Sequence, residues 1–588
     1  MREKKVALKK LLLVLILLFG AGFLVVMSLA QRYSHLDRET VVKLKRPITP
    51  DQEQKLLALT TPLLGAPPKA PKPRVVIVGM DGLDFQYLDP LMKEGKLPNF
   101  KRVMEEGSRG ILLSIIPPQS AGAWPAMVTG CKPGKTNLLN FRVYNPLSRK
   151  IVLTDGRYLE RPALWDILGE YGKKSIVINE PMSYPPHKIR GILISGLLAP
   201  EGKIYTYPEA LSSVLDDIGY KREAVPKGEG FFAPQSTLLS DLLLTERKRM
   251  ELALLLMEKN DWDLIFCMFS STDRMMHHLG RHFTLEDLEK NLLEMDRILG
   301  VFLDHLPQDA TLLLTSDHGF TLYPMQFSVP RWLEQEGYWV LPQEGMPKKT
   351  PTFRFLQFLK RLKEKTPLPD IPGIHWPHPL QRDDITPPID WERTRAISAE
   401  VGGNWGSIRI LRKGNEKELL ENEITGKLAQ LVNPKTGEPV VKRIMRGKDL
   451  FSGPYQALMP DLVFELKETR ADFAFHDQLF RKEPVYHHRL EGVLLGWGNG
   501  IRKGTLLPSS DITDITPTAL YLLATPVAEE LDGKIVDTLF DSSFITAHPP
   551  QQIPHYSTKK VEWVGNPDQS GESPEDIKET LRSLGYLQ

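Results

Sequence analysis

The sequence predicts an α/β protein with a largely parallel central sheet, helices on both faces, and one transmembrane helix at the N-terminus. Short apolar and β-branched runs alternate along the 588 residues with amphipathic helical stretches. This order is typical of parallel strands joined by helical crossovers. Hydrophobic residues make up 41% and charged residues 25% of the chain, which excludes disorder as its main state. The third observation is one long apolar segment near the N-terminus.

That apolar segment is residues 11–30, which read LLLVLILLFGAGFLVVMSLA. As a helix it is about 30 Å long, enough to cross a bilayer. Residues 1–10 carry five basic side chains and one acidic side chain, so they are expected to stay cytoplasmic while the rest is exported. A cleaved signal peptide is the alternative, because Ser28-Leu29-Ala30 resembles a cleavage site. The apolar run exceeds the usual length of about 7–15 residues, so we expect an uncleaved single-pass anchor with a periplasmic or extracellular body.

The rest of the chain divides by composition. Residues 31–73 are polar and proline-rich and suit a linker. A catalytic body is expected over 74–545, followed by a tail at 546–588 whose last residues predict a helix. Residues 340–392 are rich in proline and basic residues and interrupt the alternation, so we expect an inserted cap there. Its stretch FRFLQFLKRLKEK predicts a helix that packs on the body or, alternatively, lies on the membrane surface.

Charge and cysteine content exclude several classes of protein. Lys and Arg number 75 against 73 Asp and Glu, a net charge of +2, so no nucleic-acid binding is expected. The two cysteines, Cys131 and Cys267, exclude a disulfide framework and a cysteine-based zinc module. We expect both thiols to be free and buried.

Five strands are predicted, at residues 75–80, 174–179, 263–269, 311–316 and 492–497. Polar clusters adjoin four of them. Asp81 follows the first strand; Asp273 and His277 follow the third at i, i+4 spacing. The pair Asp317-His318 follows the fourth, and His487-His488 precedes the last. Ligands bind at the carboxyl ends of the strands in such sheets, so these clusters are expected to converge. Mixed imidazole and carboxylate ligands suit zinc, manganese or iron. Each cluster alone could instead be a turn, a cap or a solvated helix face.

A nucleophile is predicted in the segment IPPQSAGAWPAMVTG, at residues 116–130. Ser120 comes just before a helical stretch, where backbone amides favour an anionic phosphate. A serine hydroxyl needs a base or a metal to become nucleophilic. An ordinary helix-capping serine is the alternative.

These motifs together resemble the alkaline phosphatase superfamily, and within it the type I phosphodiesterase/nucleotide pyrophosphatase branch. The shared order is strand–Asp, a PPxS/T…W…TG segment, DxxxH, DHG, and a late His-Arg-x-x-Gly before a strand. The resemblance covers roughly residues 74–587 and implies a three-layer α/β sandwich. It further implies two divalent metals, usually zinc. One would be held by four residues and the other by three: Asp81, Ser120, Asp317 and His318, and then Asp273, His277 and His488.

The implied activity is hydrolysis of a phosphodiester or pyrophosphate through a phosphoserine on Ser120. A phosphomonoesterase, or a transferase that moves a phospho-headgroup from a lipid, is the alternative. The substrate would be a small phosphoester or a lipid. Two departures from the family pattern bear on this: serine replaces the usual threonine, and 133–138 lacks the His and Gly of the family's PGKHGI stretch. The first leaves the chemistry intact, and the second affects the substrate pocket. The segment SAGAW lacks the sulfatase signature, so sulfate esters are not expected.

Overall fold

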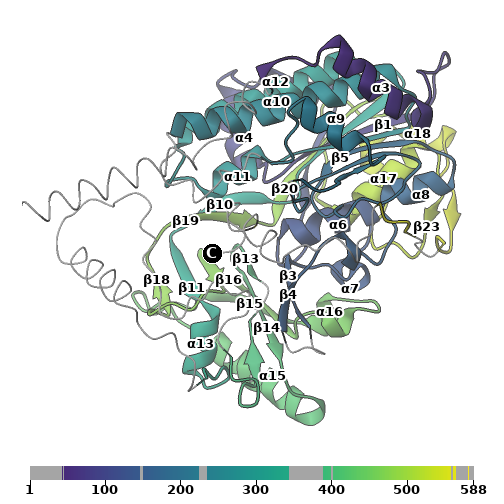
Figure 1. The fold of residues 1–588 in the computed structure, drawn as a ribbon. Coiled ribbons are helices and arrows are strands. Elements are labelled where there is room, and N and C mark those ends of the chain that lie inside the picture. Colours follow the sequence, from purple (N-terminus) through teal and green to yellow (C-terminus); the bar gives the residue numbers. More distant parts are fainter. Residues whose placement is uncertain are drawn as a thin grey trace, which may run out of the picture.

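A mixed sheet of ten strands forms the centre of the body in the computed structural model (Figure 1). The strand order is β21-β2-β20-β9-β1-β8-β5-β6-β7, and β22 also pairs with β2. The bounds are β1 (Arg74–Met80), β2 (Ser108–Leu113), β5 (Ser175–Glu180), β6 (Gly191–Ser195), β7 (Thr206–Tyr207), β8 (Leu264–Phe269), β9 (Ala310–Thr315), β20 (Glu491–Gly498), β21 (Thr505–Leu506) and β22 (Ser510–Asp511). The structure describes residues 43, 45–145, 150–200, 202–223, 235–342, 389–398, 401–557, 561–564 and 581.

All five predicted strands belong to this sheet, as β1, β5, β8, β9 and β20. The sheet is mixed and, as predicted, largely parallel, since most of its strands run in one direction. Strands β9, β1, β8, β5 and β6 run parallel, but β20 is antiparallel to both β9 and β2, and β7 is antiparallel to β6. The reason is where the chain enters β20. It arrives at the carboxyl edge of β9, without a helical crossover, and must therefore run in the opposite direction.

Helices cover both faces of the sheet, as predicted. The strands are buried on both sides, so alternate side chains of β1 enter two different cores: Val76 and Val78 enter one, Val75 and Ile77 the other. The helices of the first core are α3 (Pro50–Leu64), α4 (Phe85–Lys93), α5 (Pro98–Glu106), α9 (Leu211–Asp217), α10 (Gln235–Lys259), α11 (Ser271–His277) and α12 (Leu285–His305). Those of the second are α6 (Ser120–Thr129), α8 (Leu164–Glu170) and α17 (Ile515–Leu522).

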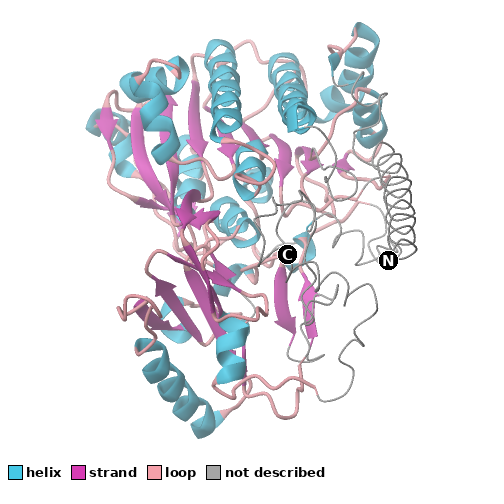
Figure 2. Cartoon of the chain, turned by 90° about the vertical axis from the view of Figure 1, so that its left-hand side faces the viewer, coloured by secondary structure: helices cyan, strands magenta, loops and turns pink. Residues whose placement is uncertain are grey.

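Residues 325–342, 389–398 and 401–481 build a separate part of the molecule, which we call the lobe; it lies below the body in Figures 1 and 2. It has its own buried core, which includes Phe327, Ile408 and Phe464. Its elements are β11 (Met325–Ser328), α13 (Val329–Gln335), β12 (Ala396–Ile397), β13 (Val401–Gly402), β14 (Trp405–Ile410), α15 (Gly414–Ala429), β15 (Val441–Arg446), α16 (Gly447–Leu450), β16 (Leu462–Leu466), β17 (Thr469–Asp472) and β18 (Phe480–Arg481).

A two-stranded ribbon of β10 (Gly319–Tyr323) and β19 (Val485–Arg489) joins the lobe to the body. The smaller elements of the body are β3 (Arg142–Asn145), β4 (Lys150–Leu153), α7 (Pro133–Thr136), α18 (Ser542–Ala547), β23 (Val527–Ala528) and β24 (Gln552–Ile553). Cys131 and Cys267 are both buried and free.

Three predicted features lie wholly or largely outside the described residues. They are the anchor at 11–30, most of the insertion at 340–392 with its stretch FRFLQFLKRLKEK, and most of the helix expected in the tail. Within the part of the chain that is described, no helix combines the length and the hydropathy needed to span a bilayer.

Candidate active site

The predicted ligands meet at the carboxyl edge of the three central strands. Strands β9, β1 and β8 are parallel neighbours, so Asp317, Asp81 and the α11 residue Asp273 emerge side by side. The turn after β1 requires glycine, because Gly82 has φ +70° and a Cβ there would lie 2.8 Å from the Phe320 ring. Its N–H donates to Asp317 Oδ1 at 3.3 Å. The sheet topology therefore brings together carboxylates that lie far apart in the chain, Asp81 and Asp317 by more than 200 residues.

Ser120 begins helix α6 and is fully buried beside two of these residues. Its Oγ lies 3.2 Å from His318 Nε2 and 3.5 Å from Asp81 Oδ1. His318 Nε2 lies 3.2 Å from Asp317 Oδ2 and 3.7 Å from Asp81 Oδ1. The four residues assigned to one metal by the resemblance thus lie within contact distance of one another.

The other three predicted ligands form a second group. His277 Nε2 and His488 Nε2 lie 2.9 Å apart, and Asp273 Oδ1 lies 3.3 Å from the first and 3.4 Å from the second. His318 stands between the two groups: its ring stacks on His488 with centroids 3.7 Å apart, and its Nε2 is 4.0 Å from Asp273 Oδ1. By mutual distance the atoms cluster as Asp273, His318 and His488, and as Asp81, Asp317 and His318.

These distances fit metal coordination. Ligand atoms about 2.0 Å from a tetrahedral zinc are about 3.3 Å from one another, close to the spacings within both groups. Oδ2 of Asp317 is buried and receives no hydrogen bond from the described residues. A cation would compensate that oxygen, since a buried carboxylate is costly without a partner. The donor set of carboxylates, imidazoles and a hydroxyl is one that zinc, manganese or iron accepts.

The electrostatics also point to a missing positive charge. Burial raises the pKa of Asp81 well above its usual range, and the nearby carboxylates of Asp317 and Asp273 raise it further. Burial likewise raises the pKa of Asp317. Burial lowers the pKa of both His277 and His318, so these imidazoles are neutral and able to ligate. Burial would also raise the pKa of Asp273, but His277, His488 and Arg274 lower it well below its usual range. A bound cation would replace the protons that the raised pKa values of Asp81 and Asp317 favour.

Several residues that contact the predicted ligands were not themselves predicted from the sequence. Trp124 donates its Nε1–H to Asp81 Oδ2 at 3.3 Å; its place in the PPxS/T…W…TG segment was the available signal. His488 Nδ1 lies 3.0 Å from the Pro118 carbonyl oxygen. His487, which the resemblance left out, accepts hydrogen bonds at Nδ1 from the backbone N–H groups of Gly403 and His488. It thus holds the backbone around His488.

The lobe reaches the site through the β13–β14 turn. The Gln119 side-chain amide donates to the carbonyl of Val401, and Tyr323 donates its hydroxyl hydrogen to the His488 carbonyl at 2.9 Å. A Cβ on Gly403 would lie 1.9 Å from that same carbonyl oxygen. The site accordingly lies where body and lobe meet, near α11, β10 and β19 (Figure 1).

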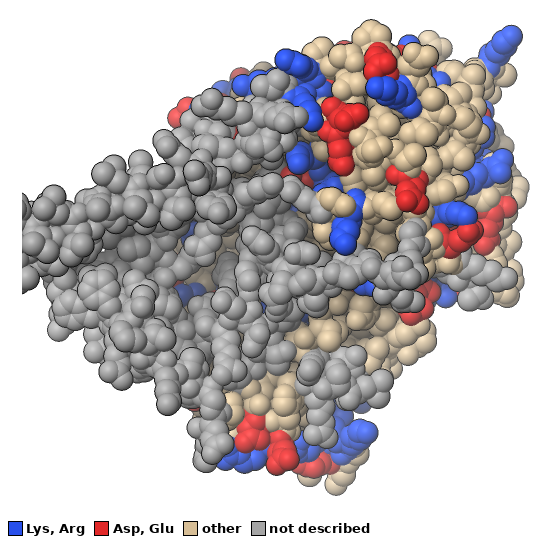
Figure 3. Space-filling model, viewed as in Figure 1, with Lys and Arg blue, Asp and Glu red and all other residues tan. Residues whose placement is uncertain are grey.

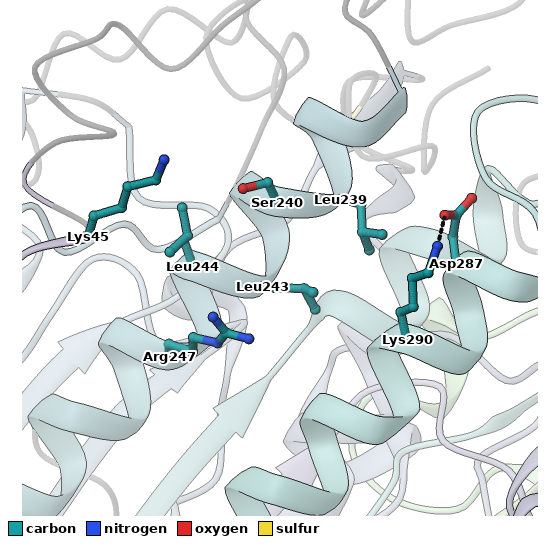
Figure 4. A pocket seen from close by; sticks show the side chains of 8 residues that line it. All are labelled: Lys45, Leu239, Ser240, Leu243, Leu244, Arg247, Asp287 and Lys290. Carbon is teal, nitrogen blue, oxygen red and sulfur yellow. Dashed lines mark ion pairs between the residues drawn. The ribbon is translucent and has the colours of Figure 1, made fainter.

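A surface groove of about 720 Å³ lies elsewhere, between α10 and α12 (Figure 4). Two of its three cations, Arg247 and Lys290, already pair with acidic side chains of α12. The groove includes none of the predicted ligands. On the described part of the face in Figure 3, positive and negative side chains are interspersed. Neither feature competes with the buried cluster as a catalytic centre.

Comparison with known proteins identifies the family. The family described as Type I phosphodiesterase / nucleotide pyrophosphatase matches residues 75–370, about half of the chain. No curated protein matches the chain.

The solved structures of phosphonoacetate hydrolase show the fold. Phosphonoacetate hydrolase from Sinorhizobium meliloti 1021, in complex with phosphonoacetate, has a TM-score of 0.51 at 14% identity, covering 77% of this chain and 96% of that one. Murine ectonucleotide pyrophosphatase / phosphodiesterase 5, an inactive variant in complex with AMP, has a TM-score of 0.45 at 14% identity, covering 80% and 100%. The family match, together with the α/β fold and the cluster at the carboxyl edge of its sheet, identifies the chain as a member of the type I phosphodiesterase/nucleotide pyrophosphatase family, in the alkaline phosphatase superfamily, and as a phosphoester hydrolase.

Proposed function

We propose that this hydrolase is a two-metal phosphodiesterase that works through a phosphoserine on Ser120. The observation that carries the proposal is the position of Ser120 Oγ, 3.2 Å from His318 Nε2 and 3.5 Å from Asp81 Oδ1. A serine hydroxyl placed among metal-ligating atoms at a helix start is suited to in-line attack on phosphorus.

Two ions, most simply zinc with manganese or iron as alternatives, would be held by the two groups. Asp81, Ser120, Asp317 and His318 would hold one, and Asp273, His277 and His488 the other. When bound, such ions lower the pKa of a coordinated hydroxyl or water and neutralise charge on the phosphoryl oxygens.

The chain's own residues supply the positioning. Trp124 and Gly82 hold Asp81 and Asp317 by hydrogen bonds at 3.3 Å, which fixes the carboxylates around Ser120. Ser120 is the first residue of α6, so a phosphate bound at its Oγ would lie at the helix N-terminus, where anions are stabilised. His318 Nδ1 lies 3.3 Å from the Gly319 carbonyl oxygen and is oriented to donate to it, so the lone pair of Nε2, 3.2 Å from Ser120 Oγ, is available to ligate a metal. The Ser120 proton would pass to water as the hydroxyl becomes nucleophilic. Attack then forms the Oγ–P bond as one ester oxygen of the diester leaves as an alcohol. The phosphoryl group keeps its other ester group while it is bound to Ser120, and water later cleaves the Oγ–P bond to release a phosphomonoester.

The compartment is part of the proposal. We place the body outside the cytoplasm, held by the apolar segment 11–30, with the basic residues 1–10 inside. A membrane-bound enzyme of this family would meet either soluble phosphodiesters or the headgroups of lipids. The family acts on small phosphoester or nucleotide substrates, so a phosphodiester is the first substrate to test.

The experiment compares aryl phosphodiester, aryl phosphomonoester and aryl sulfate turnover by the full-length protein loaded with zinc or manganese. Ser120→Ala should lower diester turnover by about 10³-fold or more while the variant still binds metal. Ser120→Thr is the matched control, because it keeps a hydroxyl at the same position, and it should retain substantial activity. Mass spectrometry of rapidly quenched protein should find the phosphoryl adduct on the peptide containing Ser120.

Other outcomes discriminate the alternatives. Full activity in Ser120→Ala would disprove the phosphoserine. A preference for the monoester would indicate a phosphatase. Metal binding without turnover of any aryl substrate, but with headgroup transfer from phospholipid vesicles to an added acceptor, would indicate the transferase.

A further inference from the structure

Arg274 lies between the predicted ligand Asp273 and the buried carboxylate of Glu223. We propose that Arg274 and Glu223 are positioning residues that hold Oδ2 of Asp273 and leave Oδ1 as the one oxygen that faces the metal. The inference rests on the proposed metal centre and goes beyond it. Glu223 belongs to none of the motifs that identify the site.

The two oxygens of Asp273 have different surroundings. Arg274 Nη1 donates to Oδ2 at 2.6 Å. Oδ1 faces the imidazoles instead, 3.3 Å from His277 Nε2 and 3.4 Å from His488 Nε2. The carboxylate is fully buried, so solvent does not compete for either oxygen. One oxygen is therefore engaged by a guanidinium, while the other points toward the ligand group.

A further group is needed to keep Arg274 in this place. Neighbouring residues on a helix do not normally face each other, yet Asp273 and Arg274 are consecutive in α11. Glu223 accepts a hydrogen bond from Arg274 Nε at 3.2 Å. The side chains of Arg274 and Glu223 are 5% and 4% exposed. Removing either partner of such a buried ion pair leaves the charge of the other uncompensated.

Glu223 is itself held by the turn that precedes α11. Ser270 donates its hydroxyl hydrogen to Glu223 Oε2 at 2.8 Å. The backbone N–H groups of Ser270 and Ser271 both donate to Glu246 Oε1, at 2.8 and 2.7 Å. Two buried glutamates thus fix the segment that places Asp273 after β8.

The consequence concerns coordination number. A carboxylate that offers one oxygen suits four-coordinate sites of the zinc type, whereas carboxylates that offer both oxygens are common around ions with more ligands. Without the Glu223–Arg274 pair, Oδ2 is able to turn toward the metal. Loss of either residue should therefore weaken metal binding and raise the coordination number at the site of Asp273, His277 and His488.

The test uses full-length protein with Co²⁺ in place of the native metal, read by visible absorption. Four-coordinate Co²⁺ absorbs more strongly than Co²⁺ with more ligands, and the part of the spectrum lost in His277→Ala belongs to this site. Glu223→Gln and Arg274→Lys should each lower Co²⁺ affinity by about 10- to 100-fold and weaken that band. Arg274→Lys keeps the positive charge but removes the guanidinium, which bonds Glu223 through Nε and Asp273 through Nη1. This variant therefore still tests the inference if Glu223→Gln fails to fold.

Glu294→Gln is the matched control. Glu294 is also a buried glutamate paired with arginines, Arg247 and Arg297, but it is not among the residues at the site. It should change neither affinity nor spectrum. Glu223→Gln and Arg274→Lys proteins with the wild-type affinity and spectrum would overturn the inference and leave the proposed function standing. A wild-type protein that binds no Co²⁺ would overturn both.

Discussion

The body and the lobe each bury an aspartate cluster, and the two clusters are built in opposite ways. In the lobe, Asp472 Oδ2 lies 2.6 Å from His476 Nε2 and 3.2 Å from an Arg481 nitrogen, with Arg470 nearby. Burial alone would raise the pKa of Asp472, but Arg470, His476 and Arg481 hold it well below its usual range. In the body, the pKa of Asp81 and of Asp317 is raised.

The difference separates a structural carboxylate from a ligand. Protein cations surround Asp472, so that cluster is complete as it stands. In the body, burial would raise the pKa of Asp273, but His277, His488 and Arg274 hold it well below its usual range. The pKa values of Asp81 and Asp317 stay raised, so a bound cation would balance the charge of these two carboxylates. Both clusters bury aspartate side chains. They differ in whether cations of the protein compensate the charge of every aspartate.

The largest effect should come from removing a body carboxylate. Asp317→Ala should lose metal from its group and lower turnover by about 10³-fold or more, because alanine has no oxygen that could ligate the metal at that position. Metal content measured together with diester turnover checks this. In the metal-free state the variant should be at least as stable as wild type, since a repelling carboxylate is gone. A variant that keeps both its metal and its activity would remove Asp317 from the site.

The lobe cluster should respond through stability. Asp472→Asn should destabilise the protein by about 3–5 kcal/mol, because it leaves buried arginine charge uncompensated. Denaturant unfolding gives the value, and Asp304→Asn is the control, since Asp304 is 67% exposed in its pair with Arg102. Metal affinity measured on the folded fraction should stay at the wild-type value. If Asp472→Asn instead lost metal without losing stability, the comparison would be wrong.

The two clusters should also titrate in opposite directions. The folded pKa of Asp317, raised to about 6, exceeds its unfolded value of about 3.9, so the metal-free native state binds the extra proton. Asp317 should therefore cost stability increasingly as pH rises from about 4 to 6, on the order of 2–3 kcal/mol. The depressed pKa of Asp472 gives the reverse: its stabilisation is present above about pH 4 and lost as pH falls. Unfolding of metal-free wild type, Asp317→Asn and Asp472→Asn across pH 2–7 covers the Asp472 trend below about pH 4 and the Asp317 trend above it. Parallel curves for the three proteins would contradict both.

The smallest effect tests the contact between the two parts. Gly403 and Gly414 have the same φ of +57°, but a Cβ at Gly403 would lie 1.9 Å from the His488 carbonyl oxygen, while a Cβ at Gly414 meets nothing within 4 Å. Both alanine variants carry the backbone strain of about 1 kcal/mol. Only Gly403→Ala should also lower turnover, by about 10- to 100-fold, because it displaces His488. Equal turnover in the two variants would show that the lobe does not position the ligand.

Much of the site could be predicted from sequence because its residues follow buried strands whose apolar runs are easy to recognise. Asp81 and Asp317 lie directly after β1 and β9, and parallel neighbours place them together. Glu223 could not be predicted, because it reaches the site from 50 residues before Asp273 and follows no recognisable motif. The direction of β20 was also missed, since an apolar run shows that a strand is buried and not which way it runs. The contact of Gly403 with His488 depends on how the lobe docks, which has no local signal.

The strand order has a consequence for synthesis. Within the described sheet, β2 pairs only with β20, β21 and β22, all of which follow residue 490. His488 immediately precedes them in the chain. A nascent chain that already contains Ser120, Asp81 and Asp317 therefore still lacks one edge of its sheet and one of its ligands. The centre is completed by nearly the last part of the body to be translated, so a chain cut short within the lobe has most of the catalytic residues and no site.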